Sequence, residues 1–122
     1  MNPRDSSTLW PMTVKLLKKE KILRIDFNDG NLFDLSAEYL RVESPSAEVQ
    51  GHGASQKQIV SGRKDVAIVQ VESVGNYAIR LHFDDNHNTG IYSWSYLHEL
   101  GAKKNENWSR YLKMLEGLGL TR

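Results

Sequence analysis

The sequence contains no cysteine among its 122 residues. Disulfides, thiolate nucleophiles, thiolate zinc sites and iron–sulfur ligation by this chain are therefore excluded. Long apolar runs are also missing: none approaches the roughly 20 residues that cross a bilayer. The first residues, MNPRDSSTLWPM, lack the apolar segment of a secretory signal. We therefore expect a cytoplasmic protein that does not span a membrane.

An excess of one charge is missing as well. The chain has sixteen Lys and Arg residues and fifteen Asp and Glu residues, which gives a formal net charge of +1. Phosphate backbones favour concentrated positive charge, so nucleic acid is not an expected partner. What the chain does have is 39% apolar residues in a length typical of one domain, which predicts a single folded core.

Apolar and polar residues alternate along much of the chain, which is typical of half-buried strands. The pattern predicts strands at Thr13–Leu16, Leu23–Phe27, Leu32–Leu35, Gln58–Val60, Val66–Val74 and Ile79–Phe83. In the strand over 66–74 both faces are apolar, which favours a central place in a sheet.

Helical signals are fewer and gather toward the end of the chain. A cap at Ser36 predicts a short helix over Ala37–Arg41. A second helix is expected near Trp94–Leu100, ended by Gly101, and an amphipathic helix closes the chain, with Asn105 as its cap.

These elements predict an α+β fold, a mostly antiparallel sheet of short strands packed against C-terminal helices in two layers. Residues 1–12 are expected to form a mobile N-terminal leader. Residues 13–101 form the domain, and residues 102–122 the C-terminal amphipathic helix packed on it.

Two polar loops interrupt this pattern, at Ser44–Gln58 and Asp84–Gly90. The first contains SPSAEVQGHG and the second DDNHNTG, both rich in residues that accept unusual backbone angles. Loops on a rigid scaffold are where binding contacts concentrate. A serine–histidine–acid set can be drawn from Ser44, His52 and Glu48, but no strained GxSxG turn holds the serine, so we reject a hydrolase.

Two longer phrases, LRIDFNDGNLFDLSAEYLRVESPSAEVQGHG and VESVGNYAIRLHFDDNHNTGIYSWSYLHELG, stand in a fixed order. In order and spacing they resemble the family named for the amino-terminal domain of gamma-butyrobetaine hydroxylase, in a short stand-alone bacterial form. The resemblance covers roughly Lys15–Gly101. In the hydroxylases this domain precedes the iron- and oxoglutarate-dependent catalytic domain, and a similar domain is appended to a P-loop iron–sulfur scaffold protein of plastids. The resemblance thus implies an accessory module, with no activity carried over.

The resemblance also implies a zinc site in the relatives, held by three cysteines in the loop matching SPSAEVQGHG and one histidine in the loop matching DDNHNTG. His87 matches that histidine, but the cysteines are absent from this chain, so we expect this zinc site to be lost. His52 and His87 could still bind iron or zinc together if the two loops converge.

The leading hypothesis is a non-catalytic, monomeric binding or adaptor module without a cofactor, whose two polar loops form a surface for a protein partner. By family analogy that partner is related to iron–sulfur proteins or oxygenases. The alternative is a metal-binding accessory protein that uses iron or zinc at His52 and His87. Polar and aromatic residues in and beside the loops are the candidate contacts: Glu48, His52, Asn76, Tyr77, Asp85, His87, Tyr92 and Trp94. Tyr77, Tyr92, Trp94 and Tyr96 would form an aromatic floor for a ligand, or else belong to the core.

Overall fold

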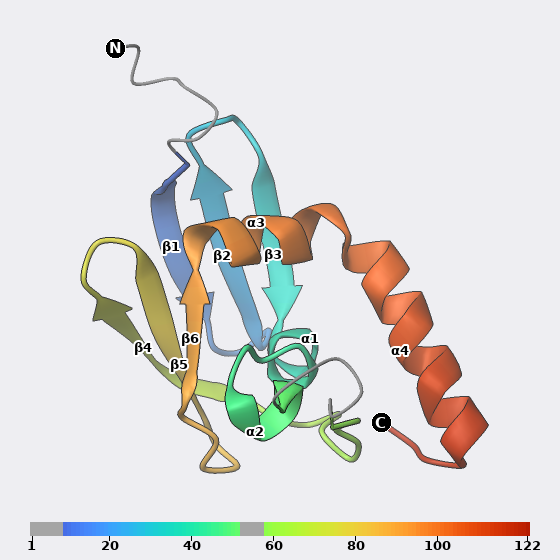
Figure 1. The fold of residues 1–122 in the computed structure, drawn as a ribbon. Coiled ribbons are helices and arrows are strands. Elements are labelled where there is room, and N and C mark those ends of the chain that lie inside the picture. The colour runs from blue at the N-terminus through green and yellow to red at the C-terminus, as the bar shows by residue number, and fades with distance from the viewer. Residues whose placement is uncertain (1–8, 52–57) are drawn as a thin grey trace.

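The computed structural model describes residues 9–51 and 58–122 and has the predicted α+β architecture. Its strands form two antiparallel sheets of three strands each, not one larger sheet (Figure 1). The first sheet has the order β1-β2-β3 and consists of β1 (Pro11–Leu17), β2 (Ile22–Phe27) and β3 (Leu32–Ser36). The second has the order β4-β5-β6 and consists of β4 (Ile68–Val74), β5 (Ala78–Phe83) and β6 (Gly90–Ser93).

Helices connect and follow the two sheets. α1 (Ala37–Val42) and α2 (Ala47–Gln50) lie between the sheets in sequence, and α3 (Trp94–Ala102) and α4 (Lys104–Leu118) follow β6. The predicted cap of α1 is confirmed, because the Ser36 hydroxyl accepts a hydrogen bond of 3.0 Å from the Tyr39 amide. No helix among residues 9–51 and 58–122 is long and apolar enough to cross a membrane.

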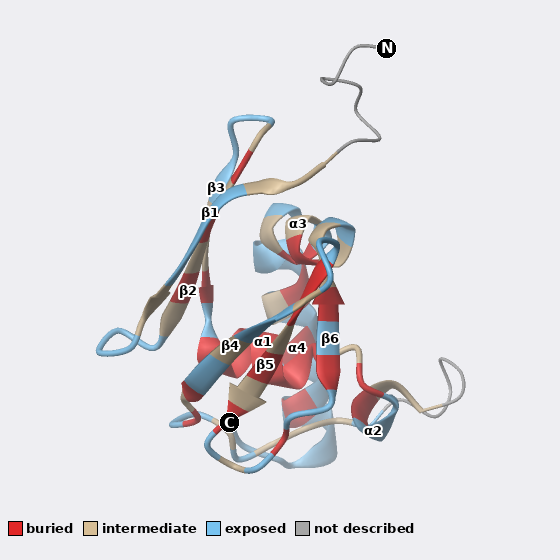
Figure 2. Ribbon diagram, turned by 90° about the vertical axis from the view of Figure 1, so that its left-hand side faces the viewer, coloured by how far each residue is buried: buried red, intermediate tan, exposed pale blue. Residues whose placement is uncertain are grey.

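One hydrophobic core joins the two sheets to α1 and α3. The central strands supply the largest share of it, and Leu23 and Ile25 of β2 and Leu81 of β5 are completely buried. Figure 2 shows the buried residues gathered in these strands and in α1. Burial of these apolar side chains is the main favourable term in the stability of the fold.

Gly101 does not end α3, contrary to the sequence prediction. The helix continues to Ala102, and Lys103 rather than Asn105 precedes α4. Glycine is required at position 101 for a packing reason, because an added Cβ would lie 2.3 Å from the Phe33 ring. α3 therefore approaches β3 more closely than any larger residue would allow.

Three other sequence predictions differ from the structure. Residues 58–60 are not a strand, and the strand predicted over Val66–Val74 begins at Ile68 and lies at a sheet edge. Its second apolar face is partly exposed, since Val69 keeps 49% of its surface accessible. At the start of the chain, Pro11 and Met12 belong to β1 and not to a leader, while residues 1–8 lie outside the described part.

Candidate functional site

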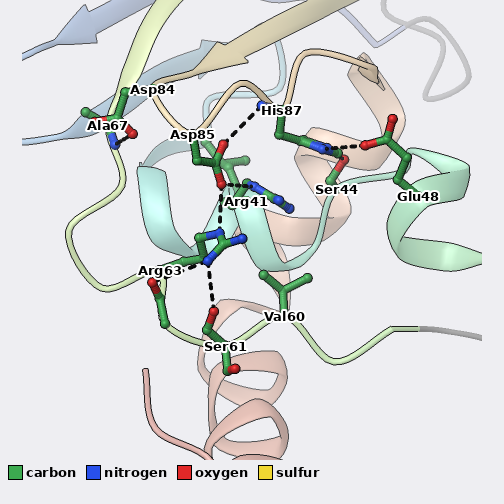
Figure 3. A network of polar contacts seen from close by, with 12 residues as sticks. Arg41, Ser44, Glu48, Val60, Ser61, Arg63, Ala67, Asp84, Asp85 and His87 are labelled. Carbon is green, nitrogen blue, oxygen red and sulfur yellow. Dashed lines mark hydrogen bonds and ion pairs between the residues drawn. The ribbon is translucent and has the colours of Figure 1, made fainter.

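The two polar loops converge beside the C-terminal end of α1. Ser44 and His87, 43 residues apart, are joined by a hydrogen bond of 2.8 Å between Oγ and Nε2 (Figure 3). A second contact of 2.6 Å joins the hydroxyls of Ser46 and Thr89. We call the set Ser44, Ser46, Glu48, His87 and Thr89 the loop junction. These bonds fix the two loops relative to each other.

His87 is the centre of the loop junction and is 5% exposed. Its Nδ1 lies 3.1 Å from Oε1 of Glu48, so both ring nitrogens have partners. Burial and the nearby positive charge of Arg41 lower the pKa of His87, and the Glu48 carboxylate opposes this only in part. The imidazole is therefore neutral at pH 7, with one nitrogen donating and the other accepting.

A cluster of charged side chains stabilises the second loop through Asp85. Nε of Arg41 donates to Oδ2 of Asp85 over 2.8 Å, and Nε of Arg63 approaches the same oxygen to 2.7 Å as an ion pair. Oδ1 of Asp85 accepts from the His87 amide over 3.1 Å. Burial raises the pKa of Asp85, but the Arg41 and His87 hydrogen bonds and the Arg63 charge outweigh it and lower that pKa below its ordinary value. Asp85 is thus a fixed anion that positions His87.

Ser44, His87 and Glu48 have the connectivity of a catalytic triad but not its accessibility. Ser44 is completely buried, and its Oγ also accepts from the Ser46 amide over 3.2 Å. On the other side, Gly90 lies so close that an added Cβ would be 2.6 Å from this Oγ. A nucleophile must reach its substrate, so this arrangement holds the loops together and offers no reaction site.

The aromatic candidates do not share one surface. Tyr92 is completely buried and donates from its hydroxyl to the Leu40 carbonyl over 2.5 Å. Tyr96 donates to the Glu43 carbonyl over 2.5 Å. Trp94 packs against the core and its indole donates to the Asn76 carbonyl over 3.0 Å, whereas Tyr77 is 58% exposed. Trp94 and Tyr92 therefore support the core.

The residues of the loop junction do not fit the closed zinc site of the resembling hydroxylases. Ser44 and Ser46 offer neutral hydroxyls already engaged in hydrogen bonds, and both nitrogens of His87 are occupied. Among residues 9–51 and 58–122, no group of three His, Cys, Asp or Glu side chains has metal-binding geometry. His52 lies outside the described residues, so a site that combines it with His87 stays a prediction.

The sequence did not predict several residues whose hydrogen bonds and ion pairs stabilise the two loops. The predicted contacts do not include Arg41 and Arg63, which pair with Asp85 of the second loop. They also do not include Ser46 and Thr89, which belong to the loops and join them. Arg41 carried no signal in the sequence, because only the structure shows that all residues of its short helix are buried. A buried cation requires an anionic partner, but nothing in the sequence identifies that partner as Asp85.

Fold and site together define a small α+β domain with two loops joined by buried polar contacts. Residues 14–98 match the family model described as gamma-butyrobetaine hydroxylase-like, N-terminal. The chain belongs to this family, which confirms the resemblance seen in the sequence. No curated protein matches the chain.

Solved structures share this fold over most of their length. One solution NMR structure is 43% identical, covers 100% of this chain and 90% of its own, and has a TM-score of 0.82. Another is 42% identical, with 93% and 89% coverage and a TM-score of 0.81. A crystal structure of a protein of unknown function from Acidithiobacillus ferrooxidans, of the DUF971 family, is 39% identical, with 84% and 99% coverage and a TM-score of 0.66.

Proposed function

We propose that this chain is a non-catalytic binding module that presents its two polar loops to a protein partner. The observation that carries the proposal is the loop junction, in which one buried and one partly buried hydrogen bond hold residues 44–51 and 84–90 together before any partner binds. A preorganised surface loses less conformational entropy on association than a flexible one. The loops are thus suited to recognition.

The outer side of the loop junction supplies the contacts. Ala47, Asn88 and Thr89 are exposed, and 61% of the Glu48 side chain is accessible although its carboxylate contacts His87. These groups offer hydrogen-bond donors, acceptors and one negative charge, a combination suited to the polar rim of a protein interface. Family context makes an iron–sulfur or oxygenase-related protein the first partner to test.

The test compares two exposed polar residues replaced by arginine. Asn88→Arg changes the loop surface, and Ser109→Arg makes the same kind of change on α4. Immobilised wild-type protein and the Ser109→Arg control should capture the same partner from native cell extract, and Asn88→Arg should lose it. Equal capture by all three proteins, or capture of nothing by the wild type, would contradict the proposal.

The alternative function, metal binding through His52 and His87, has one observation in its favour. The structure places the His87 imidazole beside the Glu48 carboxylate, so two groups that can bind iron or zinc already lie together, and a metal would replace their hydrogen bond. Under this alternative, zinc or anaerobic ferrous iron shifts the His87 ring resonances stoichiometrically, and alanine at both histidines abolishes uptake. Unchanged ring resonances at equimolar metal would rule the alternative out and leave the binding module.

A further inference from the structure

A groove of about 510 Å³ lies between β1 and β4, the strands that form one side of the molecule in Figure 1. Figure 2 views the molecule from that side, with both strands in front. Val14 and Leu16 of β1 and Val69 and Val71 of β4 line the groove, together with Lys18 and Trp94. The groove belongs to neither polar loop.

The β1 wall of the groove is a continuation of the protein core. Val14 and Leu16 pair with Ile25 and Leu23 of β2, and directly paired residues of an antiparallel sheet point to the same face. The two β2 residues are completely buried, whereas Val14 is 37% exposed. The core-facing side of the first sheet thus extends beyond what the second sheet covers.

The β4 wall has the same character. Val71 pairs with the buried Leu81 and shares its core-facing side, yet it is only partly buried. Val69 lies where the register shifts between Ile68 and Gln70, and it is 49% exposed. Apolar side chains from two sheets therefore meet solvent along one line, which is unusual unless another chain covers them.

The groove also runs between two unpaired strand edges. β1 and β4 each end their sheet, so every second backbone N–H and C=O group of these strands points away from its neighbour. Among the described residues, no hydrogen bond outside the sheets uses the backbone of residues 13–17 or 68–73. The outer edge of β3 differs, because Nζ of Lys104 donates to the Asp34 carbonyl over 3.1 Å.

Charge around the groove is predominantly positive. Lys18, in the turn after β1, lines the groove, and Lys19 is exposed beside it. Lys15 of β1 stands between the lining residues Val14 and Leu16, so it points to the opposite face of the sheet. The acidic residue of β4, Glu72, is already hydrogen-bonded to His82 over 2.9 Å. Its strand neighbours Val71 and Ser73 line the groove, so Glu72 points to the opposite face. The groove therefore favours a ligand that combines apolar and acidic groups.

We propose that this groove binds an extended segment of a partner protein in which apolar and acidic side chains alternate. The segment adds a strand to β1 or β4, so that its main chain satisfies the open edge and its apolar side chains enter the groove. When the segment adds to β1, its acidic side chains alternate to the opposite face of the sheet, where Lys15 lies. A helix has no free main-chain groups for these edges, which is why the occupant is an extended chain.

The probe for the test is a capped nine-residue peptide of alternating valine and glutamate. Added to isotope-labelled full-length protein, it should shift the amide resonances of residues 13–17 and 68–73 saturably at up to about 1 mM. The same peptide with N-methyl groups on alternate residues loses main-chain donors and should not bind. A valine–lysine peptide should bind at least about tenfold more weakly.

Two protein variants complete the test. Val69→Glu places a negative charge in the groove and should weaken binding of the valine–glutamate peptide by about tenfold. Leu118→Glu makes the same change at another exposed apolar residue, on α4, and should leave binding unchanged. No saturable shift, equal binding of the N-methylated peptide, or equal binding of the valine–lysine peptide would overturn the proposal.

A second copy of this chain is the competing occupant. In that case light scattering without peptide would show a concentration-dependent dimer that Val69→Glu dissociates, and the partner proposal would fail. The loop surface is tested by Asn88→Arg and the groove by Val69→Glu, so each proposal can fail without the other.

Discussion

Nε2 of His87 lies 2.8 Å from Oγ of Ser44, although the two residues belong to different halves of the chain. Ser44 is completely buried, and Gly90 and Tyr92 lie directly beside its hydroxyl. The small Ser44 side chain therefore makes the hydrogen bond to His87 and also leaves room for the close packing of Gly90 and Tyr92.

Ser44→Ala should lower the free energy of unfolding by about 1–3 kcal/mol, because the His87 ring and the Ser46 amide each lose a buried partner. Ser109→Ala, an exposed serine of α4, should change it by less than about 0.5 kcal/mol. Urea unfolding measures both. In a double-mutant cycle with His87→Phe, the two effects should not add, and simple additivity would contradict the coupling.

The neutral state of His87 predicts a pH dependence. Because burial and Arg41 lower the pKa of His87 in the folded protein, the unfolded chain takes up a proton first as the pH falls. Stability should therefore be complete above about pH 6.5 and decline below it, before carboxylates titrate near pH 4. In metal-free protein the His87 ring resonances should titrate with a midpoint below about 6.5. A midpoint at or above that value would show that burial and Arg41 do not control the charge of the ring.

The same measurement has a control. His87→Gln cannot take up the proton, so its unfolding free energy should vary less between about pH 6.5 and 5 than that of the wild type. An identical slope in both proteins would assign the acid sensitivity to other groups.

Arg41 and Asp85 form an ion pair whose side chains are 9% and 20% exposed. Removing one partner leaves a poorly solvated charge, so Arg41→Met should cost about 3 kcal/mol, with Arg63 limiting the loss. Arg110→Met removes an ion pair with side chains 55% and 70% exposed and should cost less than about 1 kcal/mol. Thermal unfolding compares them, and equal losses would show that burial of the Arg41 pair is unimportant.

Two glycines near the C-terminus predict opposite outcomes. Gly101→Ala places a Cβ 2.3 Å from the Phe33 ring and should destabilise the protein by about 1–3 kcal/mol. Gly117, inside α4, has nothing within 4 Å of an added Cβ. Gly117→Ala should therefore stabilise the protein by about 0.5–1 kcal/mol through helix propensity. Calorimetric melting separates the two, and a shift in the same direction would contradict the close packing of α3 on Phe33.

Most elements of the fold could be predicted from local pattern, and the errors have a common cause. The alternating residues Leu23, Ile25 and Phe27 are buried in β2, as their pattern predicts. Ser36 caps α1 with its hydroxyl, as the sequence also predicts. The two apolar faces of the strand containing Val69 predict a central place in a sheet, whereas the strand lies at an edge. Pairing partners decide whether a strand is central, and alternation within one strand carries no information about partners.

The candidate site was predicted in part. The sequence indicated two polar loops and His87, and the structure brings the loops together. The sequence could not indicate that Ser44, the first residue of that loop, bonds to His87, because this contact depends on the three-dimensional path of both loops. Likewise Gly101 predicts a helix end in the sequence, whereas the structure requires this glycine because the Phe33 ring, distant in sequence, lies against it.

The division into two sheets has a consequence for how the chain folds. Each sheet pairs only strands that follow one another directly in sequence, so each can form through short loop closures. Local pairings of this kind form quickly, whereas contacts between distant segments are slow. Docking of the two preformed meanders is then the late step, and it is the step at which the Ser44 and His87 side chains first meet. Native-state hydrogen exchange would show this as two separately protected units that open before the chain unfolds globally.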